Sequence, residues 1–154
     1  MGPHPIWSHL DYCGGGEGYY DFEPLEKDSL EVYLGEGRTP SFYALIDPLH
    51  RRLRYDNALP HPALVVRSNG SRIFHLSRDG VMRIEPGDVL AAFGGTLRED
   101  SIVGVIRENP GARAAAIVSR VLELGRGTIV AVRFIATEEP ALAEESAELT
   151  LAVA

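Results

Sequence analysis

Hydrophobic and polar residues alternate over short stretches of this chain, as they do in β-strands that bury one face. The alternating stretches are residues 6–12, 30–34 and 53–55. Other stretches are more continuously hydrophobic, which predicts inner strands at residues 42–46, 63–66, 89–93 and 129–135. Asn69-Gly70 and Asp79-Gly80 predict two tight turns, because these residue types tolerate the positive φ angles that such turns require.

One segment has helical periodicity instead. Asn109-Pro110 is a typical helix start and Gly125 a typical stop, which predicts a helix over residues 110–124. The hydrophobic residues of one predicted face are Ala114, Ile117, Val118 and Val121, and the opposite face carries Arg113, Arg120 and Glu123. A short helix is expected to precede it at residues 101–107. This helical segment is large enough to cover one sheet, not two.

The last residues differ in composition from the rest of the chain. Residues 138–154 are acidic and rich in alanine, and they end in an alternating stretch at residues 149–153. We therefore expect one domain over residues 1–137, followed by a tail that ends in a possible extra strand.

Five short motifs follow one another in a characteristic order. They are residues 16–22 (GEGYYDF), 34–39 (LGEGRT), 43–58 (YALIDPLHRRLRYDNA), 85–90 (EPGDVL) and 125–130 (GRGTIV). In this order they resemble the PPM-type serine phosphatases related to stage II sporulation protein E and to bacterial stress-response phosphatases. The resemblance implies an α+β fold, a reduced β-sandwich with one helical segment retained.

The same resemblance implies that the metal-binding residues are lost. The positions matching the family's ligand aspartates are Gly18, Leu34, Gly95 and either Gly125 or Arg126. PPM-type catalysis uses two divalent cations held by carboxylate and water oxygens, and these side chains offer no such oxygen. We therefore expect no catalytic residues and no cofactor.

An alternative interpretation is that the chain retains metal-dependent phosphatase activity. Glu17, Asp21, Glu36 and Asp47 lie near the lost positions in sequence and could form a substitute Mn or Mg site. The chain would then be a reduced metal-dependent phosphoserine phosphatase. These acids are also explained as solvated loop carboxylates, since acidic residues are mostly exposed. A third possibility is that a sheet face or groove binds a small ligand.

The family's two central helices are also missing, because Pro40 leads directly into the strand at residues 42–46. The second sheet should therefore lack a covering layer and expose hydrophobic residues. We expect a homodimer through this bare face, with interface residues Phe42, Tyr43, Leu45 and Tyr55. The leading interpretation is a non-catalytic, phosphatase-like module that binds protein, in a partner-switching signalling pathway like those its relatives serve.

Composition narrows the class of partner. The 154 residues are 45% hydrophobic, enough for a single core, and the net charge is −7. An acidic chain without a basic cluster is a poor match for nucleic acid or anionic membranes.

The beginning of the chain does not resemble a signal peptide and no stretch is long enough to span a membrane, so we expect a soluble cytoplasmic protein. Cys13 is the only cysteine, which excludes an internal disulfide.

Overall fold

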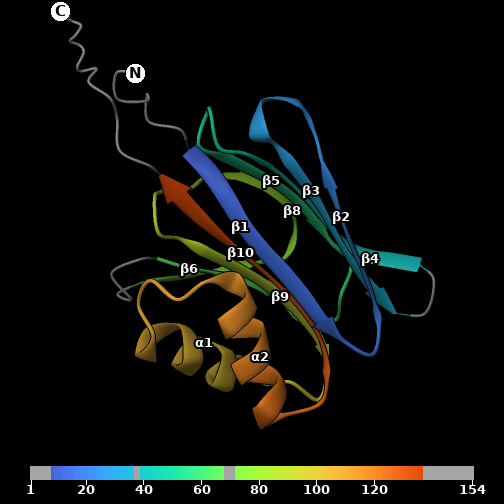
Figure 1. The fold of residues 1–154 in the computed structure, drawn as a ribbon. Coiled ribbons are helices and arrows are strands. Elements are labelled where there is room, and N and C mark those ends of the chain that lie inside the picture. Colours follow the sequence, from blue (N-terminus) through green and yellow to red (C-terminus); the bar gives the residue numbers. More distant parts are fainter. Residues whose placement is uncertain (1–7, 37–38, 68–71, 137–154) are drawn as a thin grey trace, which may run out of the picture.

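In the computed structural model, two five-stranded antiparallel sheets pack face to face (Figure 1). The structure describes residues 8–36, 39–67 and 72–136. The first sheet has the order β1 (Ser8–Gly16), β10 (Gly127–Ala136), β9 (Val89–Gly95), β6 (Ala63–Val66) and β7 (Ile73–Leu76). The second has the order β2 (Tyr19–Pro24), β3 (Leu30–Glu36), β4 (Thr39–Asp47), β5 (Arg52–Asn57) and β8 (Arg78–Arg83). A short 3-10 helix, η1 (Glu26–Asp28), joins β2 to β3.

The strand periodicity explains which faces are buried. In the second sheet, alternate residues of β3, β4 and β5 point into the space between the sheets and are almost inaccessible to solvent. The largest of them are Leu30, Leu34, Phe42 and Leu53. In the first sheet, β6 and β9 are buried on both faces, because one face meets the second sheet and the other meets the helices.

Two helices cover the outer face of the first sheet. They are α1 (Glu99–Glu108) and α2 (Ala114–Leu124), and both pack against the same hydrophobic cluster (Figure 1). The carboxylate of Asp11 on β1 accepts a 2.6 Å hydrogen bond from the first amide of α2, at Ala114. This bond caps the helix from the sheet that it covers. Neither helix of the described residues has the length and hydrophobicity to cross a bilayer.

The second sheet has no such layer on its outer face among the described residues. β3 runs into β4 through a hairpin, with Glu36 paired to Thr39, so no helix intervenes there. The expected loss of the two central helices is thus confirmed, as is the reduced α+β sandwich with one helical layer. Residues 138–154 lie outside the described part of the chain.

Two local predictions differ from the structure, and a third falls outside the described residues. Asp79-Gly80 is not a turn, since both residues lie inside β8, and the chain instead turns at the first residue of β8, Arg78, whose φ is +65°. The second helix begins at Ala114 rather than residue 110, because Asn109 ends α1 with a 3.0 Å bond from its side chain to the Val105 carbonyl. The predicted turn at Asn69-Gly70 lies outside the described residues, between the paired strands β6 and β7.

We predict effects of very different size for two neighbouring substitutions in α2. Val121 is fully buried against the first sheet, so Val121→Asp buries an unpaired carboxylate and should lower the free energy of unfolding by about 3 kcal/mol or more. Arg120 is exposed and pairs only with Glu123, so Arg120→Asp should change it by less than about 1 kcal/mol. Urea denaturation of both variants provides the measurement, and equal midpoints would contradict the assignment of helix faces.

Candidate functional site

One end of the sandwich brings together the glycine-rich turns of both sheets. The turn between β1 and β2 is attached to the start of β10 by two hydrogen bonds. The Gly18 amide donates to the Thr128 hydroxyl oxygen at 2.5 Å, and the Glu17 amide donates to the Gly127 carbonyl at 3.3 Å. These contacts join a turn near the beginning of the chain to a strand more than a hundred residues later.

Backbone atoms approach one another closely here because glycines leave no room for side chains. An ideal Cβ placed on Gly95 would lie 2.6 Å from the Cα of Gly127, and one on Gly18 would lie 2.5 Å from the Thr128 hydroxyl oxygen. Gly95 also has φ +80°, a left-handed conformation that favours glycine. Gly16 and Gly127 touch neighbouring backbone in the same way. Backbone segments of β1, β9 and β10 are therefore in direct contact at this end, although Gly16, Gly18 and Gly95 themselves remain exposed to solvent.

The positions matched to the family's metal ligands converge on this end. Gly18 and Gly95 both lie against the start of β10, and the Arg126 carbonyl accepts 2.9 Å bonds from the amide and hydroxyl of Thr96. Gly125 is close to Leu97, while Leu34 points into the core between the sheets and is 1% exposed. The order of motifs along the chain therefore reflects a real spatial cluster.

The residues of this cluster do not fit a pair of divalent cations. Such cations require several carboxylate oxygens, and the matched positions carry glycine, leucine and arginine. Of the side-chain oxygens that hydrogen bonds place in the cluster, that of Thr128 accepts the Gly18 amide and that of Thr96 donates to the Arg126 carbonyl. A carboxylate at position 18 or 95 would also overlap with its neighbours.

Of the four substitute carboxylates, the three that the structure describes, Glu17, Asp21 and Asp47, do not form one site. Asp47 ends β4 at the opposite end of the strand from the glycine cluster, where its carboxylate lies 2.7 Å from Nδ1 of His50. Asp21 is exposed on the outer face of the second sheet, and Glu17 is exposed in the β1–β2 turn. The side chain of Glu36 lies outside the described part. In the described ranges, no three histidine, cysteine or acidic side chains are grouped closely enough to hold a metal ion.

Asp47 has a local role instead. Burial alone would raise the pKa of its carboxyl, but the hydrogen bonds and charge of His50 outweigh burial and lower it below the ordinary value. Its carboxylate also accepts the His50 amide at 3.2 Å, so Asp47 stabilises the turn between β4 and β5.

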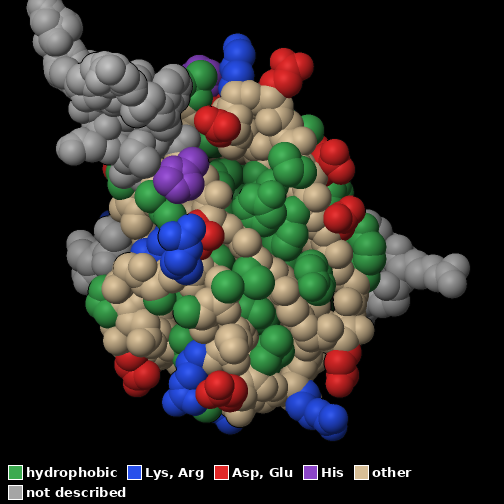
Figure 2. Space-filling view, viewed as in Figure 1, with side chains coloured by type: hydrophobic (Ala, Val, Ile, Leu, Met, Phe, Trp, Pro, Cys, Tyr) green, Lys and Arg blue, Asp and Glu red, His purple; other side chains and the backbone are tan. Residues whose placement is uncertain are grey.

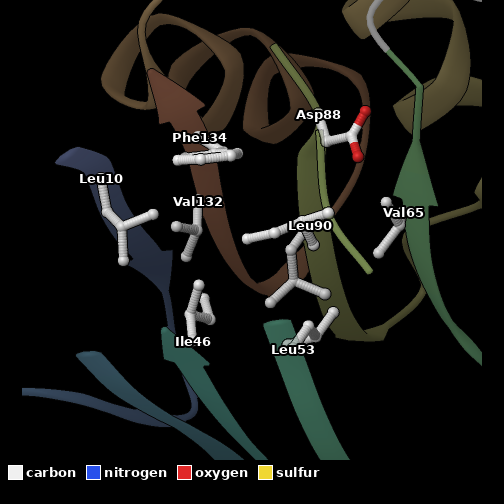
Figure 3. Close-up of a pocket in the computed structure, with 9 residues that line it drawn as sticks. Leu10, Ile46, Leu53, Val65, Asp88, Leu90, Val132 and Phe134 are labelled. Atoms are coloured by element: carbon white, nitrogen blue, oxygen red, sulfur yellow. The ribbon is translucent and has the colours of Figure 1, made fainter. Parts of the chain in front are cut away.

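A small space between the sheets lies near this opposite end (Figure 3). Its walls are hydrophobic side chains from both sheets, including Leu10, Ile46, Leu53 and Phe134, with Asp88 at the margin (Figure 3). Asp88 accepts a 2.8 Å bond from the Glu85 amide and lies 3.3 Å from Nε of Arg67. The space has room for roughly one water molecule, which is too little for an organic ligand.

The outer face of the second sheet is the largest feature without a covering element in the described structure. Tyr43 and Leu45 of β4 point outward as expected, and the ring of Tyr33 lies 5.3 Å from that of Tyr43. Both hydroxyls donate to the Glu31 carboxylate, at 3.2 Å from Tyr33 and 2.6 Å from Tyr43. Partial burial, together with the bond to Glu31 and its charge, raises the pKa of Tyr43 to about 12.

Two of the expected interface residues are placed differently. Phe42 points inward and is 1% exposed, and Tyr55 packs against the same inter-sheet core. The expectation that they lie on an exposed interface is wrong, because on each strand they alternate with the outward residues. Tyr43 and Leu45 alone of the four belong to the outer face.

A second hydrophobic surface was not expected from the sequence. Figure 2 shows hydrophobic side chains gathered over the side of the sandwich formed by β1 and β2. There the ring of Phe22 lies 4.7 Å from that of Tyr12 and 6.1 Å from that of Tyr20, and Tyr12 and Leu25 are exposed. The aromatic residues spaced along residues 12–22 were the signal for this surface.

Comparison with known proteins identifies solved structures that have this architecture. No family model matches the sequence, and no curated protein matches it either. Solved structures do match. The PP2C phosphatase domain of SpoIIE from Bacillus subtilis, with a fragment of its regulatory domain, superimposes with a TM-score of 0.62 at 10% identity over 87% of this chain. The fold is that of a reduced PPM-type phosphatase domain.

Two further structures have the same PPM-like fold. The RsbU and RsbW domains of Rv1364c from Mycobacterium tuberculosis match with a TM-score of 0.64 at 12% identity over 87% of this chain. RsbX in complex with magnesium matches with a TM-score of 0.60 at 9% identity, over 87% of this chain and 98% of that one. This chain spans 65% of the SpoIIE structure and 62% of the Rv1364c structure.

Two glycine-to-alanine substitutions should have opposite effects on stability. Gly95→Ala places a Cβ against the Gly127 backbone at positive φ, so it should lower the free energy of unfolding by more than about 1 kcal/mol. Gly104 lies inside α1 with open space around its Cβ position, so Gly104→Ala should raise the free energy of unfolding by about 0.5–1 kcal/mol. Thermal melting of both variants measures the change in stability. An unchanged melting temperature for Gly95→Ala would show that the contact with the Gly127 backbone does not require glycine.

Proposed function

We propose that this chain is a non-catalytic, PPM-phosphatase-like module that binds protein. The observation that carries the proposal is the close contact of Gly18 with the Thr128 side chain and of Gly95 with the Gly127 backbone, at positions where the resemblance places metal ligands. The matched positions carry no carboxylate, and a Cβ at position 95 would overlap with the backbone of Gly127. Loss of the metal removes the means of generating the attacking hydroxide.

The setting that we propose is a partner-switching signalling pathway in the cytoplasm. The proposal is supported by the fold neighbours, which are SpoIIE, an RsbU–RsbW protein and RsbX. In such a pathway a domain without chemistry can still act by occupying a partner. The outer face of the second sheet is the proposed binding surface, because it carries Tyr33, Tyr43 and Leu45 without a covering element in the described structure. Another signalling protein and a second copy of this chain are the proposed partners.

Titration with Mn²⁺ tests the loss of chemistry. Isothermal calorimetry should show no stoichiometric site in the micromolar range, and the protein should not hydrolyse a phosphoserine peptide with millimolar Mn²⁺ present. RsbX, whose structure contains magnesium, is a suitable positive control. A tight site together with Mn²⁺-dependent hydrolysis that Glu36→Ala abolishes would overturn the proposal in favour of a reduced phosphatase.

A further inference from the structure

The outer face of the second sheet carries an uneven distribution of charge across its five strands. Its β2–β3 half has outward acidic residues and no basic one, namely Asp21, Glu23 and Glu31. Its β5–β8 half has all of the outward arginines, namely Arg52, Arg54 and Arg83, together with Asp56 and Asp79. The central strand β4 lies between the two halves and presents Tyr43 and Leu45.

Within the described chain this face does not neutralise its own charges. Glu23 lies directly opposite Glu31, Arg52 opposite Arg83, and Asp56 opposite Asp79. Like charges in directly opposed positions destabilise a sheet. Among the described residues, no ion pair is formed by Glu23, Arg52, Arg54, Asp56 or Asp79. The charges are thus available to a partner.

The two halves also differ in shape. A shallow hollow on the β5–β8 half is lined by Tyr43, Arg54, Asp56, Asp79 and Val81, among others. Val81 is 57% exposed, so a hydrophobic group on this half faces solvent in the isolated chain. The β2–β3 half carries an aromatic ring instead, at Tyr33.

We infer that a second copy of this chain covers the outer face, related by a two-fold axis that runs along β4. This inference rests on the proposed function, since it names one partner of the same surface. Rotation about an axis parallel to the strands exchanges the halves, so the acidic β2–β3 half of each copy lies over the arginine-bearing half of the other. Two-fold association through one self-complementary surface is the commonest form of homodimer.

The strand register specifies which residues meet. Glu31 shares a row with Leu45 and Arg54, and rotation about β4 keeps each row in place, so Glu31 lies over Arg54 of the second copy. In the next row, Tyr33 lies over Asp56 of the second copy and its ring enters the hollow.

One contact opposes association. Asp21 meets Asp79 of the second copy at the outer margin of the face, where water and salt screen the repulsion. Leu45 and Tyr43 of both copies meet at the centre, away from solvent, where burial of hydrophobic surface contributes most.

The size of the face sets the expected strength. Five strands about 4.8 Å apart and about 20 Å long give a contact of about 500 Å² per copy. Stable dimers bury about 800 Å² per partner, so this dimer should be reversible and should weaken as salt is added.

Charge reversal on one half and then on the other tests this arrangement. Variant E23R/E31R gives both halves a net positive charge, and variant R52E/R54E gives both halves a net negative charge. Each variant alone should be monomeric by sedimentation equilibrium at concentrations where the wild type is dimeric. An equimolar mixture should recover the dimer mass, because both contacts are then between opposite charges.

Matched controls carry the same charge changes on the helical side. Variants E108R/E123R and R107E/R120E alter exposed residues of α1 and α2, and both should remain dimeric. Circular dichroism melting checks folding, which matters for E23R/E31R because Glu31 accepts the two tyrosine hydroxyls. If E23R/E31R does not fold, the comparison of R52E/R54E with its control R107E/R120E still tests the dimer. Arg52 and Arg54 make no described ion pair, so their substitution should not disturb the fold. R52E/R54E should be monomeric and R107E/R120E dimeric.

Several results would overturn the inference. The first is a wild type that stays monomeric at about 100 µM, for example because residues 137–154 occupy the face. The second is a charge-reversal variant that remains dimeric on its own. The third is an equimolar mixture of the two variants that stays monomeric. None of these results concerns metal, so they leave the proposed loss of catalysis untouched. Conversely, Mn²⁺ binding would overturn the proposed function whatever the mass of the protein.

Discussion

Close backbone contact at one end of the sandwich is the constraint on which the account of this protein depends. Gly16, Gly18, Gly95 and Gly127 let the β1–β2 turn and the end of β9 lie directly against the start of β10. The contact leaves no room for a Cβ at Gly95 without displacement of the Gly127 backbone, and it joins the first strand pair to the last strand. The absence of side chains at these positions is thus the physical basis both of the close packing and of the proposed loss of metal binding.

A single helical layer has the second large consequence. The first sheet is buried on both faces because α1 and α2 cover it, and Asp11 attaches α2 to β1 by capping its first amide. The second sheet has a hydrophobic inner face and an outer face that mixes tyrosines, leucine and charges. This mixture is typical of a surface that meets another protein in water rather than of a core that lost its cover.

The sequence predicted most of the architecture but little of the site. Strand periodicity located β3, β4, β6, β9 and β10, and the buried face of α2 was assigned from the spacing of Ile117, Val118 and Val121. The order of motifs matched Gly18, Leu34, Gly95 and either Gly125 or Arg126 to one set of ligand positions. It could not show the bond from Gly18 to Thr128, because contacts across more than a hundred residues depend on packing. It also misplaced Phe42, since hydrophobicity alone does not tell which face of a strand is buried.

Nuclear magnetic resonance with a paramagnetic ion tests the central claim most directly. Mn²⁺ broadens the signals of amides near its binding site, and the ¹⁵N-labelled protein reports Gly18, Gly95 and Thr128 individually. The account predicts that these three signals keep their intensity, relative to the rest of the protein, when one to two equivalents of Mn²⁺ are added. Selective loss of these signals at stoichiometric Mn²⁺ would show that the glycine-rich end of the sandwich binds metal, and would contradict the proposed loss of metal binding.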